Sequence, residues 1–138
     1  MKVARDFMRR TLGAYGQLSI RRSFNWNKDM LQVLPNKPIN YEILREIYKD
    51  KEDLQKAWPG ARYPLCTTQW NEFLTQSKFN ISLFFETEGR TVGHLILLDK
   101  GDQRLFLCFV ILDTSVRGRG LASHMLQLTE NYVVSNLE

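Results

Sequence analysis

Apolar positions form three segments of strand length in the second half of the chain. These segments are residues 79–87, 91–99 and 104–112, in which apolar side chains alternate with polar ones or follow one another directly. Residues 88–90 (EGR) and 100–103 (KGDQ) join them, and both linkers combine glycine with polar residues, as hairpin turns do. The pattern therefore predicts an antiparallel meander of three strands.

The last of these segments is apolar on both of its faces. In the first segment a single apolar face carries Ile81, Leu83 and Phe85. Strict alternation in the third segment predicts one side with Leu105, Leu107, Phe109 and Ile111 and the other with Phe106, Cys108, Val110 and Leu112. Because a strand that is dry on both faces is typical of the interior of a helix-covered sheet, we expect residues 104–112 to form a central strand.

A helix is predicted after the third strand. Its apolar stripe consists of Leu121, Met125, Leu128 and Tyr132, widened by Ala122, Leu126 and Val133. We expect this helix to pack back onto the sheet. The connection between strand and helix contains the loop VRGRGLAS, residues 116–123.

Residues 41–48 (YEILREIY) fit two kinds of element. Their alternation suits a strand, whereas Ile43 and Ile47, four residues apart, suit a helix. Periodicity leaves both open, and we favour the strand.

Two short helices are predicted between this segment and the meander. Asp50 can cap the first, which Pro59 and Gly60 end, and either Thr67 or Thr68 can cap the second. Their apolar residues are Leu54, Ala57, Trp58, Trp70, Phe73 and Leu74.

The segment of residues 26–40 favours turns over regular structure. It contains three asparagines and two prolines, which favour turns and interrupt long regular elements: Asn27, Pro35, Asn36, Pro38 and Asn40. We therefore expect a boundary between an N-terminal basic appendage, residues 1–40, and a main domain, residues 41–138.

Composition indicates a folded, soluble protein. The chain has 138 residues, of which 43% are apolar, enough for the core of one globular domain. Its longest apolar run, Leu105 to Leu112, is far shorter than the roughly 20 residues of a membrane span, and no signal-peptide core follows the N-terminal charges. We expect a cytoplasmic protein with no membrane span.

The positive charge is confined to the start of the chain. Residues 1–22 carry six basic side chains and one acidic, a net charge of +5, whereas the other 116 residues carry 13 basic and 14 acidic, a net charge of −1. A basic amphipathic helix there could contact nucleic acid, an acidic partner or a membrane surface, or serve as an organellar targeting segment. We favour a solvated helix docked by its apolar side.

The two cysteines do not indicate a metal site. Cys66 and Cys108 lie too far apart to form half of a zinc site, and Cys108 is in a strongly apolar segment. We expect both to be reduced, non-catalytic thiols, and we expect no metal.

The loop before the last helix has the chemistry of an anion site. The first N–H groups of a helix lack partners within it and carry partial positive charge. Gly118 and Gly120 leave the backbone accessible, and Arg117 and Arg119 add full charges. An ordinary loop is the alternative. A dinucleotide fingerprint lacks its third glycine here, and the lysine of a P-loop is absent.

The last strand of the predicted meander is followed by R-G-R-G-L-A and a helix. This arrangement resembles that of the GNAT (Gcn5-related N-acetyltransferase) superfamily, whose signature is Q/R-x-x-G-x-G/A. Arg117, Gly120 and Ala122 occupy the fixed positions, and the similarity extends from about Tyr41 to the end. The resemblance implies an α/β (α+β) fold of the acyl-CoA N-acyltransferase-like kind. Its central sheet would be mixed, mainly antiparallel and flanked by helices, and would lack the usual C-terminal strands.

The resemblance also implies a co-substrate and the residues that bind it. Acetyl-CoA would transfer its acetyl group to an amine of a small molecule or peptide. Backbone groups of Val110, Ile111 and Leu112 would pair with pantetheine, and a backbone N–H of that strand would polarise the thioester. The pyrophosphate would be held by the loop residues Arg117, Gly118, Arg119, Gly120, Leu121, Ala122 and Ser123.

No residue is assigned as catalytic base. The candidates are Glu86, Glu88, Asp113 and His94. Solvation at strand ends explains the carboxylates, and a buried, hydrogen-bonded position explains His94. We expect no proton transfer by His124.

Family members continue beyond the loop helix with a fifth strand and further elements. Residues 4–16 faintly resemble the family's late helix, and residues 17–22 are strand-like, so permutation, or exchange within a homodimer, would restore the sheet. Two other functions remain open. One is a CoA-binding module without turnover, and the other is a nucleic-acid-associated protein that uses residues 1–22.

Overall fold

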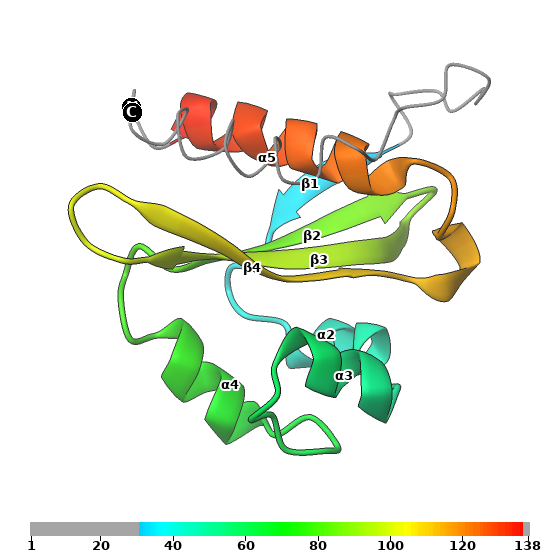
Figure 1. Cartoon of the computed structure of the whole chain (residues 1–138), viewed down its shortest axis with the longest axis horizontal. Coiled ribbons are helices and arrows are strands. Elements are labelled where there is room, and N and C mark those ends of the chain that lie inside the picture. Colours follow the sequence, from blue (N-terminus) through cyan, green and yellow to red (C-terminus); the bar gives the residue numbers. More distant parts are fainter. Residues whose placement is uncertain (1–30, 137–138) are drawn as a thin grey trace.

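Four strands form one sheet in the computed structural model, which describes residues 31–136. They are β1 (Gln32–Pro35), β2 (Ile81–Thr87), β3 (Arg90–Asp99) and β4 (Leu105–Leu112), and they lie side by side in that order (Figure 1). Every strand pair within the described residues is antiparallel. The predicted meander and its mainly antiparallel sheet are therefore confirmed.

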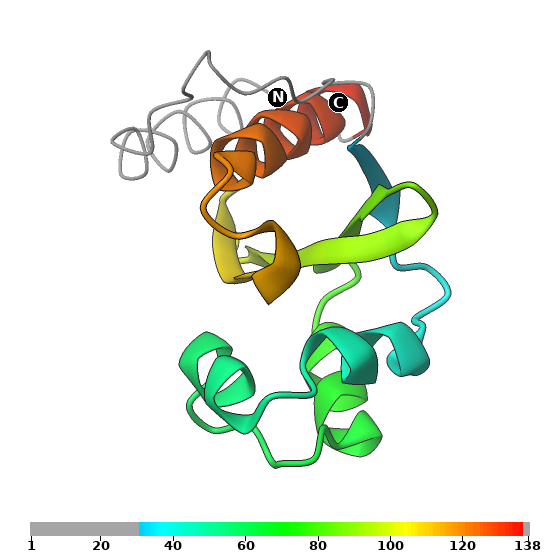
Figure 2. The same cartoon turned by 90° about the vertical axis from the view of Figure 1, so that its right-hand side faces the viewer.

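Helices cover both faces of the sheet. The helices α2 (Tyr41–Ile47), α3 (Lys51–Ala57) and α4 (Thr67–Leu74) lie on one face, and α5 (Leu121–Asn136) lies on the other (Figures 1 and 2). The predicted α/β architecture, a sheet flanked by helices, is thus observed. Within residues 31–136, no helix combines the length and apolarity needed to cross a membrane.

Each face of the sheet has its own hydrophobic cluster. Between the sheet and α5 the buried residues include Leu83, Phe85, Leu95, Leu97 and Met125. Between the sheet and α2 to α4 they include Leu44, Tyr48, Trp70, Phe84 and Ile96. Alternate residues of β2 and β3 therefore divide between the two clusters, as the pleat requires. The shared face predicted for Ile81, Leu83 and Phe85 is confirmed.

Residues 41–48 form a helix and not the strand that we favoured. The side chain of Asn40 accepts a hydrogen bond from the N–H of Ile43 at 3.0 Å, which caps the first turn of α2. Leu44 and Tyr48, four residues apart, are buried against the sheet. The helical spacing of the apolar residues thus outweighs their alternation.

The two short helices are confirmed, with one change of cap. Asp50 caps α3 by accepting a hydrogen bond from the N–H of Asp53 at 3.0 Å, and the helix ends at Ala57, one residue earlier than predicted, with Trp58 as its C-cap. The N-cap of α4 is Cys66, and neither Thr67 nor Thr68 has that role because α4 begins at Thr67.

Two features of the sheet differ from expectation. Residues 32–35, inside the segment interpreted as a boundary, form β1, which pairs with β2. Among the described residues β4 lies at the edge of the sheet, so the prediction of a central strand is wrong. The reason is that helices on both sides can bury the two faces of a strand while its lateral edge stays open.

The alternation of β4 is broken at Phe109. Two residues, Phe109 and Val110, lie opposite the single residue Leu95, because His94 pairs with Ile111 and Ile96 pairs with Cys108. This β-bulge moves Phe109 to the side of Cys108 and Ile111, against α2 to α4, whereas Leu105, Leu107, Val110 and Leu112 face α5. The two faces predicted by strict alternation are therefore wrong from Phe109 onward.

The predictions for the N-terminal basic segment lie outside the described residues. They concern the basic helix of residues 1–22, the family-like helix of residues 4–16 and the strand-like residues 17–22.

Candidate functional site

The loop between β4 and α5 contains two glycines in left-handed backbone conformations. The φ angle is 78° at Gly118 and 74° at Gly120, a region that residues with a side chain rarely adopt. A Cβ atom built on either glycine would meet no protein atom within 4 Å. Conformation, and not crowding, therefore requires glycine at both positions, and the space beside them is open to a ligand.

The loop leads into the first turn of α5, a helix of 16 residues that begins at Leu121. Its first N–H groups have no partners within the helix, and the helix dipole makes this end partly positive. Arg119 is exposed and forms no ion pair with the described residues. Backbone donors and a full positive charge thus meet where a phosphate could bind.

Arg117 connects the loop to two other elements. Its Nε donates a hydrogen bond to the carbonyl of Leu112 at 2.7 Å, at the end of β4. Its Nη2 donates to Oδ2 of Asp53 in α3 at 3.0 Å. The short helical turn η2 (Thr114–Val116) lies between β4 and Arg117. The guanidinium therefore fixes the start of the loop against both the sheet and the helical layer.

A groove of about 430 Å³ follows β4 as far as Arg117. It is lined by Asp53, Lys56, Ala57, Leu107, Cys108, Phe109, Val110, Ile111, Leu112 and Arg117. The structure thus brings four of the residues implied by the resemblance, Val110, Ile111, Leu112 and Arg117, to one groove. The other six, Gly118 to Ser123, continue from Arg117 into α5 and are not part of the lining.

Sequence analysis missed the contribution of α3 to this groove. Asp53, Lys56 and Ala57 are spaced three and four residues apart, so they share one face of the helix. That spacing is visible in the sequence. It does not reveal that the face points toward β4, because this depends on packing between residues about fifty positions apart.

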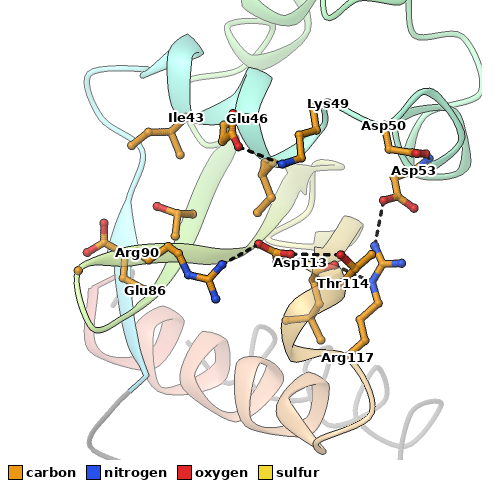
Figure 3. A pocket seen from close by; sticks show the side chains of 14 residues that line it. Ile43, Glu46, Lys49, Asp50, Asp53, Glu86, Arg90, Asp113, Thr114 and Arg117 are labelled. Atoms are coloured by element: carbon orange, nitrogen blue, oxygen red, sulfur yellow. Dashed lines mark hydrogen bonds and ion pairs between the residues drawn. The ribbon is translucent and has the colours of Figure 1, made fainter.

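A second cavity, of about 470 Å³, shares Asp53, Leu112 and Arg117 with the groove and extends toward α2 and the β2 to β3 hairpin (Figure 3). Its charged residues are Glu46, Asp50, Asp53, Glu86 and Asp113, against Lys49, Arg90 and Arg117. Carboxylates outnumber cations there, which disfavours a phosphate. In the smaller groove Lys56 and Arg117 outnumber Asp53, so it is the better candidate for an anionic ligand.

His94 is not accessible to a substrate. Its side chain is fully buried, with Nδ1 at 2.7 Å from the Tyr48 hydroxyl and Nε2 at 2.7 Å from the Ser82 hydroxyl. Burial lowers the pKa of His94 to about 3, so the ring is neutral at physiological pH. The interpretation of His94 as a buried, hydrogen-bonded histidine is confirmed.

Two of the candidate carboxylate bases, Glu86 and Asp113, line the larger cavity. Asp113 accepts a hydrogen bond from the N–H of Ser115 and pairs with Arg90, and these interactions hold its pKa below the usual value. Glu86 lines the larger cavity, and Glu88 is exposed in the β2 to β3 turn. None of these carboxylates is part of the groove lining.

Cys108 is the thiol that lines the groove. Burial raises its pKa to about 11, so it is protonated and weakly nucleophilic at neutral pH. Both Cys66 and Cys108 are free thiols. Within residues 31–136, no three histidine, cysteine or acidic side chains are placed to hold a metal ion.

The whole of this arrangement, from α2 to α5, falls within a known family pattern. Residues 41–136 match the family model described as the acetyltransferase (GNAT) family. The matched range is well over half of the 138-residue chain and contains the groove, the glycine loop and the first turn of α5. The chain therefore belongs to the acetyltransferase (GNAT) family.

Proposed function

We propose that this protein is an N-acetyltransferase that transfers the acetyl group of acetyl-CoA to a primary amine of a small molecule or peptide in the cytoplasm. One observation carries the proposal. The groove along the edge strand β4 runs, at Arg117, directly into a loop with two left-handed glycines and a helix N-terminus. A long ligand with an amide-containing arm and a pyrophosphate suits this succession of sites.

The groove fits the pantetheine arm of acetyl-CoA. An edge strand presents backbone N–H and C=O groups that no neighbouring strand takes up. On its outer side β4 has no strand partner among residues 31–136. Val110, Ile111 and Leu112 would pair there with the pantetheine amides, and the loop from Arg117 to Ser123 would bind the pyrophosphate through its N–H groups.

The reaction would be a direct transfer. The neutral amine nitrogen forms a bond to the thioester carbon, the carbon–sulfur bond breaks, and CoA leaves as a thiol after taking up a proton. A backbone N–H of β4 would stabilise the oxyanion of the tetrahedral intermediate. Deprotonating a lysine-like amine at pH 7 requires about 4–5 kcal/mol, so water or a base must accept its proton.

A CoA-binding module without turnover is the second candidate function. It is favoured by the position of the predicted bases, since Glu86, Glu88, Asp113 and His94 all lie outside the groove lining. The ionisable residues that do line the groove are Asp53, Lys56, Cys108 and Arg117.

We also propose that a second copy of the chain can pair with the first half of β4. The groove begins at Leu107, which leaves the start of β4 at Leu105 beyond it. Light scattering of the purified protein with and without CoA measures this association. A monomeric mass under both conditions would contradict it.

Thermal melting with added ligand tests the proposed function. At 100 times its Kd, acetyl-CoA should stabilise the native state by about 2.7 kcal/mol, which shifts the melting temperature of a domain of this size by several degrees. S-acetylpantetheine, which lacks the pyrophosphate, is the matched control and should bind far more weakly. No shift with millimolar acetyl-CoA would contradict both the enzyme and the module. Consumption of acetyl-CoA with a panel of amines then distinguishes these two.

A further inference from the structure

A chain of hydrogen bonds runs beneath the sheet from Asn36, the residue after β1, to the bulge of β4. Asn36 donates through Nδ2 to Oγ of Ser82 at 3.1 Å, and Ser82 lies 2.7 Å from Nε2 of His94. On its other side His94 contacts the Tyr48 hydroxyl at 2.7 Å, and this hydroxyl donates to the carbonyl of Phe109 at 3.0 Å. Tyr48 and His94 are only 1% and 0% exposed.

The donors and acceptors of this chain allow one arrangement of protons. The Tyr48 hydroxyl has a single hydrogen, which the Phe109 carbonyl must receive because a carbonyl cannot donate. Nδ1 of His94 must then carry the hydrogen that the Tyr48 oxygen accepts. Since the ring is neutral, Nε2 accepts from the Ser82 hydroxyl. Every polar group of the chain is satisfied, and all of its hydrogens point toward Phe109.

Phe109 needs such support because its backbone is strained. Its φ angle is 56°, in the left-handed region that bulky residues rarely occupy. The ring of Phe109 packs on both Trp58 and Phe73, with centroid distances of 5.4 and 5.1 Å, and these two rings also contact each other at 4.9 Å. The helical layer therefore holds this residue twice, by its ring through the aromatic cluster and by its carbonyl through Tyr48.

The hydrogen bond to Phe109 sets the orientation of a whole peptide unit. In a trans peptide the N–H points opposite to the C=O. Since the Phe109 carbonyl points to Tyr48, the N–H of Val110 points to the opposite side of that peptide. Phe109 and Val110 both line the groove along β4. The direction of a potential donor in the groove is thus determined from the helical layer beneath it.

We infer that Tyr48 is a positioning residue, whose hydroxyl holds the Phe109 carbonyl and so aims the Val110 N–H for binding the acetyl-CoA thioester. This inference rests on the proposed function. His94 and Ser82 act through Tyr48, because they fix the direction of its hydrogen. Orientation of a backbone N–H in this way needs no exposed catalytic side chain, in agreement with the absence of the candidate bases from the groove lining.

Replacement of Tyr48 by phenylalanine tests the inference. Tyr48→Phe removes one hydroxyl and keeps the ring that packs on Trp70 at 5.1 Å. The matched control is Tyr63→Phe, because Tyr63 also donates to a backbone carbonyl, that of Lys49 at 3.1 Å, away from the groove. In Tyr48→Phe we expect the ¹H–¹⁵N resonance of the Val110 amide to shift, because the peptide between Phe109 and Val110 is no longer held by the hydroxyl, and in Tyr63→Phe we expect that resonance not to move.

Kinetics separates positioning from structural support. Tyr48→Phe should lower kcat for acetyl transfer by about tenfold, while the Kd for CoA stays within about twofold because the glycine loop is untouched. Tyr63→Phe should leave both unchanged. An unchanged kcat in Tyr48→Phe overturns the inference. So does a fall in CoA affinity as large as the fall in kcat, since that is the result of general loosening.

Two further measurements keep the inference testable if Tyr48→Phe fails to fold or if the protein has no acetyltransferase activity. Ser82→Ala removes the donor to His94 and should give the same kinetic change to a smaller extent. The long-range ¹H–¹⁵N NMR spectrum of wild-type His94 should show the hydrogen on Nδ1, and a hydrogen on Nε2 would overturn the proton arrangement. Absence of acetyl-CoA binding by the wild type refutes the proposed function alone, because the NMR results for Val110 and His94 depend on no ligand.

Discussion

Arg117 and Asp53 are 64 residues apart in the sequence, and their side chains form an ion pair of 3.0 Å between the glycine loop and α3. The pair lies where the groove along β4 meets the larger cavity, and both residues line both (Figure 3). Its side chains are 42% and 21% exposed, so water screens it in part. One of the two arginine charges in the proposed pyrophosphate loop is therefore partly neutralised by the protein itself.

Removing the charge of Asp53 should strengthen the binding of CoA. In Asp53→Asn the amide oxygen can still accept from Arg117, but the carboxylate no longer repels phosphate. At about 8 Å and an intermediate dielectric this repulsion is worth roughly 1 kcal/mol, or about fivefold in Kd. Titration calorimetry at low and high salt measures the effect, which should diminish as salt rises.

Asp102→Asn is the control for that experiment, since Asp102 is paired with Arg104 in the β3 to β4 turn, away from the loop. It should leave the Kd for CoA unchanged. A Kd that is equal or higher in Asp53→Asn at low salt would mean that the carboxylate orients Arg117 more than it opposes the phosphate.

Alanine at either loop glycine should destabilise the fold. Gly118→Ala and Gly120→Ala each force a residue with a side chain into a left-handed conformation, at a cost of about 1–2 kcal/mol in the free energy of unfolding. Urea denaturation measures this. Gly60→Ala is the control, because the φ angle of Gly60 is not positive and the added methyl would make only an ordinary contact, 3.5 Å from Trp58 Nε1. Equal stability of Gly118→Ala and wild type would refute the assignment of left-handed backbone.

Gly93 should resist substitution for a different reason. A Cβ atom at this position in β3 would lie 3.0 Å from Sδ of Met125 in α5 and 3.4 Å from the carbonyl of Ile111. We expect Gly93→Ala to lower the free energy of unfolding by about 1–3 kcal/mol. In a double-mutant cycle with Met125→Ala the two losses should be less than additive, since the smaller side chain makes room. Full additivity would show that α5 does not press on Gly93.

The burial of His94 predicts a dependence of stability on pH. Its pKa is about 3 in the folded protein and 6.5 as the ordinary value, so between these pH values the unfolded chain binds a proton that the folded one does not. The contribution of His94 to stability is complete above pH 6.5. It should fall as the pH is lowered toward 3, by at most about 1.4 kcal/mol per pH unit.

Urea denaturation at pH 7.5, 6.0 and 5.0 measures this slope. His94→Gln should have a shallower slope than wild type, whatever its absolute stability. Because the lowered pKa values of Asp99 and Asp113 act at more acidic pH, they contribute little in this range. Equal slopes in the two proteins would place the His94 pKa near its ordinary value.

Local signals in the sequence predicted the elements that depend on neighbouring residues. The cap at Asp50, the hairpin at Gly89 and the apolar stripe of α5 were all found because each is determined within a few positions. The helix of residues 41–47 also had a local signal, the cap Asn40, but alternation was given more weight.

Features determined by tertiary structure were not predictable in this way. β1 has one partly buried residue among four and exists because it pairs with β2, about fifty residues later. No residue preference would put phenylalanine at a φ angle of 56°, so the bulge at Phe109 follows from Tyr48, Trp58 and Phe73. Of the groove lining, Val110, Ile111, Leu112 and Arg117 could be predicted, but the first half of β4 and the residues of α3 could not.

The two tryptophans of the aromatic cluster around Phe109 should report ligand binding through their intrinsic fluorescence. Trp58 stacks on the Phe109 ring at 5.4 Å, and Trp70 meets the same ring edge-on at 5.7 Å. A ligand that displaces this ring changes the surroundings of both indoles, so their fluorescence emission should change when the groove fills. With Trp26 replaced by phenylalanine, occupancy of the groove becomes readable in solution without any label.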